Sequence, residues 1–287
     1  MPEIINRIVR FLYGQPAGQL IRLAQIYAVL PGLDEGEIGE ALHRMRDQHL
    51  IESTFQNDAV RLVQDGRDAW NDGSIVQQTM GMQYVGTRYG NAAVHIVVTS
   101  NNGESGGSGF FSADYPGWIV TAAHVLRERD LVRILNRHGD ILAVPPLQTL
   151  LHADTDLALL RCNCPGGVNP IRVEWRHDAI QPMERLLVLG YPAIPNLRPD
   201  LDHITAELRQ VTRDFRGERE SLVISSVTLP GSSGGPVLSR RGRAIGIVEQ
   251  ENIAERLGER TIHAFTATPA RYLAELRLPN PVAGEEA

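Results

Sequence analysis

Residues 229–238 read Leu-Pro-Gly-Ser-Ser-Gly-Gly-Pro-Val-Leu, and every other motif in the chain is interpreted in relation to this stretch. Glycine adopts backbone conformations that other residues avoid, so glycines on both sides of a serine suit a loop that lifts a hydroxyl clear of the main chain. Such a loop also brings the N–H groups of Gly231 and Ser233 close to whatever that hydroxyl attacks, as an oxyanion hole requires. Taken alone, the stretch also fits an ordinary turn in a β-rich domain. A serine nucleophile therefore needs a base and an orienting acid elsewhere in the chain.

A candidate base stands where an apolar strand ends. Residues 118–125 read Trp-Ile-Val-Thr-Ala-Ala-His-Val, so a strand runs into small residues and then into His124, which holds the imidazole at the strand end. The chain has nine histidines, and a random histidine is more often a satisfied surface or core residue. This context makes His124 a candidate base, and the resemblance described next selects it among the nine.

Three motifs together resemble the chymotrypsin-like, or trypsin-fold, serine peptidases. The stretch at 229–238 resembles their nucleophile loop, and Thr-Ala-Ala-His at 121–124 resembles their histidine motif. Gly-Gly-Ser-Gly-Phe-Phe at 106–111 is similar to the strand that precedes the histidine in bacterial members. The resemblance covers about residues 90–280 and implies a mainly β, two-barrel peptidase domain. Many short apolar runs separated by turn residues, followed by one closing helix at 268–276, agree with that architecture.

The resemblance also implies the remaining site residues. In the family the orienting aspartate directly precedes an apolar-Ala-apolar strand, which selects Asp156 and leaves Asp154 as the alternative. The nucleophile aligns with Ser233, so His124, Asp156 and Ser233 follow the chain order of the chymotrypsin-like enzymes and not that of subtilisin. Asp156 would hold the tautomer of His124, which would take the proton of Ser233. We predict a serine endopeptidase, a hydrolase that acts on a protein or peptide and uses no metal and no cofactor.

The specificity pocket is predicted from the same resemblance. In the family its base lies six residues before the nucleophile, which is Val227 here, and an apolar base leaves an arginine or lysine side chain unpaired at high cost. Val248 lies on the expected edge strand, followed by Glu249 and Glu251, and His263 lies on the facing strand. The two glutamates either recruit basic substrate residues or are solvated, and His263 either enters the pocket or faces outward. We expect cleavage after small or medium apolar residues.

The first quarter of the chain has a different pattern. Apolar residues recur at helical spacing in three segments, and two short strands around a polar turn at 56–58 follow them. Asp34 is a candidate N-cap with Glu37 three residues later, the capping-box arrangement. Three helices and a hairpin resemble a winged-helix domain. The predicted order is a small α+β winged-helix-like domain at 1–72, a linker at 73–89, the peptidase domain at 90–280 and a disordered tail at 281–287.

Charge disfavours nucleic acid as a partner of this domain. Residues 1–72 hold seven arginines and eleven acids, a net charge of −4, and the whole chain carries −6. A helix that enters a groove lined with phosphates normally carries the opposite balance. We therefore expect a protein partner or self-association, and we keep a DNA-binding regulator with a peptidase-like sensor domain as the alternative function. A pseudopeptidase is disfavoured because all three triad positions are filled.

Composition sets further limits on chemistry and location. All 28 basic residues are arginine, which excludes a Ser–Lys dyad. Cys162 and Cys164 stand too close together for a mutual disulfide and lack the partners of a zinc site. No signal peptide is recognised at the N-terminus, and no apolar segment is long enough to span a membrane. We expect a cytoplasmic bacterial protein with a regulated processing role.

Overall fold

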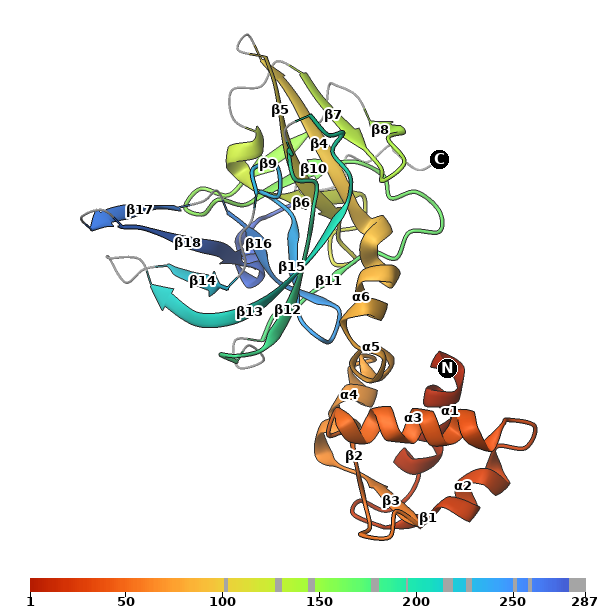
Figure 1. Cartoon of the computed structure of the whole chain (residues 1–287). Helices are drawn as coiled ribbons and strands as arrows, with labels where there is room; N and C mark the ends of the chain where they lie inside the picture. The colour runs from red at the N-terminus through yellow and green to blue at the C-terminus, as the bar shows by residue number, and fades with distance from the viewer. Residues whose placement is uncertain are drawn as a thin grey trace. The chain divides into compact units, whose positions relative to one another are not determined.

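The computed structural model describes residues 1–100, 103–126, 131–143, 148–176, 181–194, 196–213, 219–225, 229–249, 252–257 and 260–278. The chain divides into two units, one of Met1–Val85 with Arg240–Gly242 and the other of Gly86–Ser239 with Arg243–Ala287 (Figure 1). Each unit has its own apolar core. No helix among the described residues is long and apolar enough to cross a membrane.

The first unit combines helices with a small antiparallel sheet of order β1-β3-β2. Its elements are α1 (Pro2–Tyr13), β1 (Ile21–Arg22), α2 (Leu23–Val29), α3 (Glu35–Asp47), β2 (Ile51–Ser53), β3 (Ala59–Leu62), α4 (Gln64–Asn71) and α5 (Ile75–Met80), and α6 (Met82–Tyr89) spans the boundary between the units. The predicted N-cap is present, since the Asp34 carboxylate accepts the N–H of Gly36 at 3.3 Å. Three helices followed by the β2–β3 hairpin occur in the expected order, and the winged-helix identity stays a prediction.

Residues 73–89 differ from the expected linker because they are helical. In α5, Ile75 and Val76 are buried in the core of the first unit, where α5 packs against α1. The glutamines that made this segment look like a linker are also buried, and Gln78 donates to the Ser74 hydroxyl at 2.7 Å. The boundary between the units therefore lies inside α6, at Val85, and not at residue 72.

Strands make up most of the second unit. The first group is β4 (Ala93–Ser100), β5 (Gly103–Phe111), β6 (Trp118–Thr121), β7 (Leu131–Leu135), β8 (Ile141–Ala143), β9 (Thr149–Leu151) and β10 (Ala158–Arg161). The second group is β11 (Arg172–Val173), β12 (Arg185–Gly190), β13 (Asp202–Arg213), β14 (Glu220–Ile224), β15 (Pro236–Leu238), β16 (Arg243–Val248), β17 (Asn252–Leu257) and β18 (Arg260–Pro269). The described part of the unit also has three short 3₁₀ helices: η1 (Gly90–Ala92) before β4, η2 (Ala123–Leu126) after β6 and η4 (Ala270–Glu275) after β18.

The two groups of strands form one sheet each. Within the described residues, the first sheet has the order β8-β7-β4-β5-β6-β10-β9 and stays open, as half a barrel. The second has the order β11-β16-β15-β12-β13-β14-β18-β17, and an added pairing of β16 with β18 closes it into a barrel. The hairpin of β17 and β18 extends away from that barrel (Figure 1). The mainly β, two-barrel fold and the α+β region before it were predicted correctly.

Burial alternates along the strands as the pattern of apolar residues requires. In β4, Val94, Ile96 and Val98 are buried in the sheet interior, while the residues between them are less covered.

The closing helix expected at 268–276 is shorter in the structure, because β18 continues as far as Pro269, which pairs with Gly246 of β16. Only residues 270–275 then turn into η4.

Candidate active site

Two glycines shape the loop that carries the candidate nucleophile. Gly231 has a φ of +94°, and a Cβ at that position would lie 2.5 Å from the carbonyl oxygen of Tyr191. Gly234 has a φ of +87°, and a Cβ there would lie 2.1 Å from the carbonyl oxygen of Ser108. Both positions therefore require glycine, for conformation and for space. The loop is pressed against β5 and against the chain that follows β12.

The two serines of this loop differ in exposure. Ser232 is 0% exposed, and its Oγ has no hydrogen-bond partner in the described part of the chain. Ser233 is only partly buried, and its carbonyl oxygen accepts the N–H of Ser108 at 2.7 Å. The main chain of Ser233 is thus fixed to β5, and Ser233 is still partly exposed at the surface. This difference favours Ser233 over Ser232 as the reactive serine.

The backbone amides of the loop also differ in their bonding. The N–H of Ser232 donates to the oxygen of Leu229 at 3.0 Å, and that of Gly234 donates to the oxygen of Val248 at 2.8 Å. The N–H groups of Gly231 and Ser233 make no hydrogen bond to any described residue. These are the two amides predicted for an oxyanion hole, and within the described part of the chain neither is used in a hydrogen bond.

His124 and Asp156 form a pair held by two hydrogen bonds. His124 lies in η2 directly after β6, and Asp156 lies just before β10, which pairs with β6. One carboxylate oxygen of Asp156 accepts the backbone N–H of His124 at 2.8 Å, and the other lies 2.5 Å from Nδ1 of the ring. The Asp156 main-chain oxygen also accepts the N–H of Ala123 at 3.2 Å. The ring is thus oriented by its Nδ1 side.

The alternative acid, Asp154, does not face the imidazole of His124. Its side chain is 68% exposed, and its carboxylate pairs with Arg219 at 3.2 Å. Within the described residues, Asp156 is the carboxylate bonded to His124. The structure records no hydrogen bond between His124 and Ser233 in that part of the chain. Catalytic hydrogen bonds are often long before substrate binds, so this geometry is compatible with a triad.

Ser108 joins the two halves of the site. Its hydroxyl is fully buried, donates to the oxygen of Gly231 at 2.7 Å and accepts the N–H of Tyr191 at 2.8 Å. Its own carbonyl oxygen accepts the Thr121 hydroxyl at 2.7 Å. One residue of β5 therefore contacts the end of β6, the nucleophile loop and the chain after β12. The sequence marks it only as a serine between glycines, so its role was missed.

The predicted specificity pocket is only partly described. Val227 and Glu251 lie outside the described residues, and of His263 only the backbone is described, where it pairs with Ile253. Val248 is 1% exposed and belongs to the apolar core of the second barrel, so its side chain is not an open pocket wall.

Glu249 differs from both expectations for it. Its two carboxylate oxygens accept the hydroxyls of Thr266 and Thr268, at 2.6 and 2.5 Å, so this partly exposed side chain is bonded within the barrel rather than left free in a loop. The reason is the register of the barrel, because Glu249 follows β16 and faces β18, which carries both threonines. The sequence gives no signal of that pairing.

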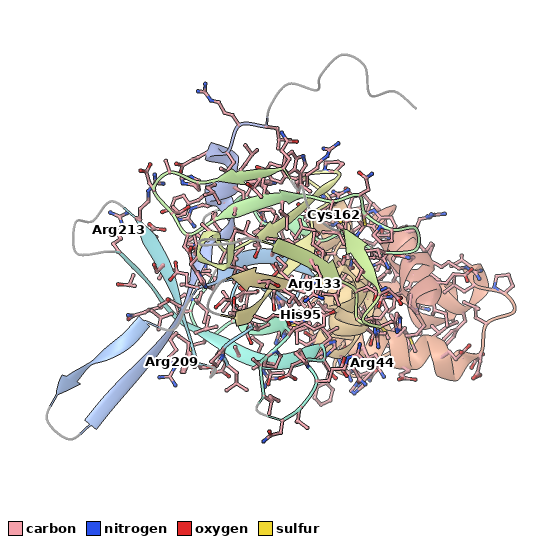
Figure 2. All side chains as sticks on the ribbon, turned by 90° about the horizontal axis from the view of Figure 1, so that it is seen from above. Arg44, His95, Arg133, Cys162, Arg209 and Arg213 are labelled. Atoms are coloured by element: carbon pink, nitrogen blue, oxygen red, sulfur yellow. The ribbon has the colours of Figure 1, made fainter. Side chains whose placement is uncertain are left out.

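The two cysteines are free thiols, as expected from their spacing. Cys162, labelled in Figure 2, lies just after β10, and burial raises the pKa of its thiol to about 11. A thiol held in the neutral form is a poor nucleophile. Cys162 is therefore a weak candidate for a nucleophile.

Comparisons with known proteins agree with this geometry. Residues 107–247 match the family model described as a trypsin-like peptidase domain. The uncharacterized protein y4bJ of Sinorhizobium fredii is 31% identical over 152 residues, which cover 50% of this chain and 22% of that protein. The match thus spans less than a quarter of the curated relative.

Two solved structures of the HtrA-type protease AlgW with a tripeptide, one of them a serine-to-alanine variant, share the fold of the second unit. They are 21% and 20% identical to this chain, with TM-scores of 0.54. Each covers 67% of this chain, which spans 61% and 60% of theirs, respectively. The resemblance predicted from the three motifs is confirmed.

Proposed function

Because this chain carries a trypsin-like peptidase domain with the two-barrel, chymotrypsin-like fold, we propose that it is a serine endopeptidase with Ser233, His124 and Asp156 as its catalytic triad. The observation that carries the proposal is the pair of bonds from Asp156 to the backbone N–H and to Nδ1 of His124. Such a carboxylate fixes the imidazole tautomer and stabilises the imidazolium that forms during reaction.

The proposed reaction is acyl transfer. With the proton of His124 on Nδ1 and donated to Asp156, the lone pair of Nε2 is available as a general base. Nε2 takes the proton of Ser233, whose Oγ attacks the scissile carbonyl, and the free amides of Gly231 and Ser233 stabilise the oxyanion. The imidazolium then protonates the leaving amine. Water attacks the acyl-enzyme by the same route and restores Ser233.

The direct test is a digestion of an unbiased peptide library by the wild-type protein and by Ser233→Ala, analysed by mass spectrometry. We expect a set of cleavage sites with the wild type that is absent with the variant. Identical sets would mean that the cuts come from a contaminant. No cuts from either protein, at several pH values and with the folded chain verified, would count against peptidase activity.

For specificity, we predict cleavage after Val, Ala or Leu and no preference for basic residues. An apolar base at Val227 cannot pair with a charge, and the Glu249 carboxylate is already occupied by the hydroxyls of Thr266 and Thr268. The same library reports the preference. The control is Glu249→Gln, which should leave the cleavage profile unchanged. A profile dominated by cuts after Arg or Lys would overturn the prediction.

The first unit is proposed to contact protein and not DNA, in a regulatory role. On α3, the guanidinium of Arg44 is bonded to Glu40 at 2.7 and 3.0 Å, and that of Arg46 to Asn57 at 2.8 Å. Both cations are thus engaged inside the unit, and five acids stand on the same segment, residues 34–47.

Free thiols at Cys162 and Cys164 support a reducing, cytoplasmic setting for the protein.

A gel-shift assay tests this role, and the alternative of a DNA-binding regulator, directly. With double-stranded DNA of mixed sequence we expect no retardation at low salt. Binding to DNA phosphates requires cationic side chains that displace the counterions of the DNA, and the arginines of α3 are already bonded inside the unit. Retardation that weakens steeply as salt is added would favour the DNA-binding regulator. A basic winged-helix protein run in parallel shows that the assay detects such binding.

A further inference from the structure

A buried histidine lies at the start of the loop that carries Asp156. The Nδ1 of His152 accepts two backbone N–H groups, from Asp154 at 3.1 Å and from Thr155 at 3.2 Å. The side chain is only 5% exposed. An amide N–H can only donate, so Nδ1 must present a lone pair and the ring proton must be on Nε2. His152 is therefore held as a neutral imidazole in one defined tautomer.

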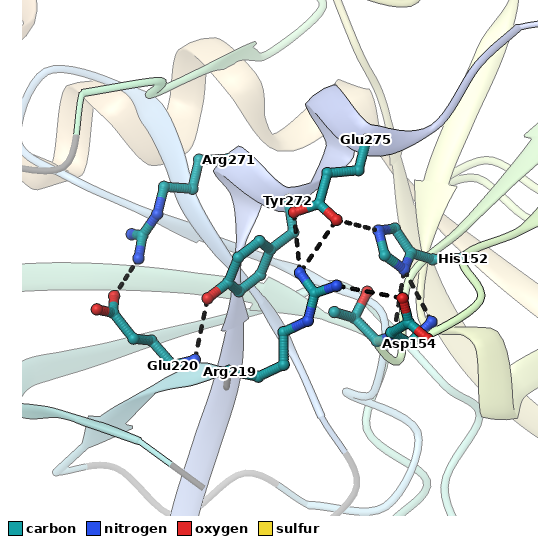
Figure 3. A network of polar contacts seen from close by, with 8 residues as sticks. His152, Asp154, Arg219, Glu220, Arg271, Tyr272 and Glu275 are labelled. Atoms are coloured by element: carbon teal, nitrogen blue, oxygen red, sulfur yellow. Dashed lines mark hydrogen bonds and ion pairs between the residues drawn. The ribbon is translucent and has the colours of Figure 1, made fainter. Parts of the chain in front are cut away.

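The second ring nitrogen of His152 faces a carboxylate that comes from a segment far along the chain (Figure 3). Nε2 lies 3.5 Å from an oxygen of Glu275, in η4. Arg219, just before β14, donates to both oxygens of Glu275, at 2.9 and 3.1 Å, and to Asp154 at 3.2 Å. The hydrogen bond from Arg219 lowers the pKa of Glu275, so that carboxylate stays ionised. Segments far apart in sequence thus meet around one imidazole, whose Nε2 forms no hydrogen bond within the described part of the chain.

Arg219 is itself held in place by an aromatic ring. Its guanidinium lies 5.0 Å from the ring centroid of Tyr272, whose hydroxyl accepts the N–H of Glu220 at 3.0 Å. The network in Figure 3 therefore connects η4, the start of β14 and the loop of the acid. On the side of the loop, Nδ1 of His152 bonds only to backbone N–H groups. Such a side chain acts on the path of the main chain.

The loop from His152 to Leu157 is closed by its ends as well. The N–H of His152 donates to the oxygen of Leu157 at 2.9 Å, which closes the turn 152–157. Asp156 lies in this turn, two residues before β10 begins. Without Nδ1, the amides of Asp154 and Thr155 lose their acceptor, and the turn loses the contacts that fix its path. Catalytic groups need their geometry held to within about 0.5 Å.

We propose that His152 is a positioning residue, whose neutral imidazole holds the turn 152–157 so that the carboxylate of Asp156 faces His124. It touches neither substrate nor the reacting atoms. The proposal rests on the proposed role of Asp156 in peptide hydrolysis, but the hydrogen bond between Asp156 and His124 exists whether or not the protein is a peptidase. That bond therefore provides a measurement independent of activity.

The experiment compares His152→Leu with His152→Asn in the full chain. Leucine fills a similar space and offers no acceptor, whereas the side-chain oxygen of asparagine can accept N–H groups two residues ahead in an Asx-turn. We expect His152→Leu to lower kcat about 100-fold, the scale of a misplaced catalytic group, with KM unchanged, and His152→Asn to retain most of the wild-type kcat. Thermal melts of all variants report folding.

The second readout is the low-field proton NMR signal of the Nδ1–H of His124, assigned by its loss in His124→Ala. It should persist in the wild type and in His152→Asn, and weaken or disappear in His152→Leu. This comparison decides the role of His152 even if no peptide is cleaved. An unchanged signal and unchanged kcat in His152→Leu would overturn the proposal. Equal losses in both variants would also overturn it, because they would show that packing and not the acceptor matters.

A double-mutant cycle covers the case in which His152→Leu does not fold. Glu275→Ala removes the carboxylate that faces Nε2, at a residue whose side chain is 45% exposed. We expect it to lower kcat severalfold in the protein with His152 and to have a smaller effect in His152→Asn, which has no Nε2 and keeps only the indirect contact through Arg219 and Asp154. Additive effects of the two substitutions would contradict the proposal.

Discussion

Replacing Ser233 by alanine is expected to abolish peptide hydrolysis, with kcat falling about 10⁶-fold, because the attacking oxygen is removed. His124→Ala should lose about as much, and the double variant no more than either, since the two residues act as one unit. The oxyanion hole remains in both variants, so a small residual rate above the uncatalysed reaction is expected. kcat/KM on a peptide identified in the library digestion gives the measurement.

The neighbouring serine supplies the control for this prediction. Ser232 is fully buried with its hydroxyl unpartnered among the described residues, and an unsatisfied buried hydroxyl costs about 1–3 kcal/mol. Ser232→Ala should therefore keep hydrolysis and should not lower the free energy of unfolding. A fluorophosphonate probe should label the wild type and Ser232→Ala. Labelling that persists in Ser233→Ala would refute the assignment of the nucleophile.

Asp156→Asn is expected to lower turnover about 10⁴-fold while leaving the protein folded. In the wild type, Asp156 accepts both the backbone N–H of His124 and the proton on Nδ1. An asparagine keeps one acceptor, and its amide group donates toward Nδ1. The imidazole proton then moves to Nε2, where the base should carry its lone pair. The loss should appear in kcat, and substrate binding should change little.

Asp154→Asn is the matched control, since it changes the same atoms two residues earlier in an exposed carboxylate that pairs with Arg219. Its effect should be small beside that of Asp156→Asn. Stopped assays under single-turnover conditions resolve both rates. If Asp154→Asn shows the larger loss, the acid of the triad has been assigned to the wrong aspartate.

Local motifs were predictable from the sequence, and long-range partners were not. The strand before His124 and the glycines around Ser233 are short-range patterns, so the two-barrel fold could be predicted correctly without coordinates, and the catalytic roles of the two residues stay predictions. The helices at 73–89 were missed because a polar segment rich in glutamine gives no sign that Ile75 and Val76 dock into a core. The acceptor role of His152 was missed for a related reason, as its tautomer depends on folded backbone and on Glu275, far along the chain.

The Ser108 hydroxyl has a consequence for the order in which the proposed site can be assembled during synthesis. A strand made early in synthesis supplies the group that bonds both the oxygen of Gly231 and the N–H of Tyr191, two segments made much later. A chain synthesised only as far as the first sheet contains His124 and Asp156 but lacks the nucleophile loop. A separately folded second barrel would have the loop without its buried support. On the proposed function, the site is therefore complete only after the second barrel has been synthesised, and a partial chain would not cleave neighbouring proteins.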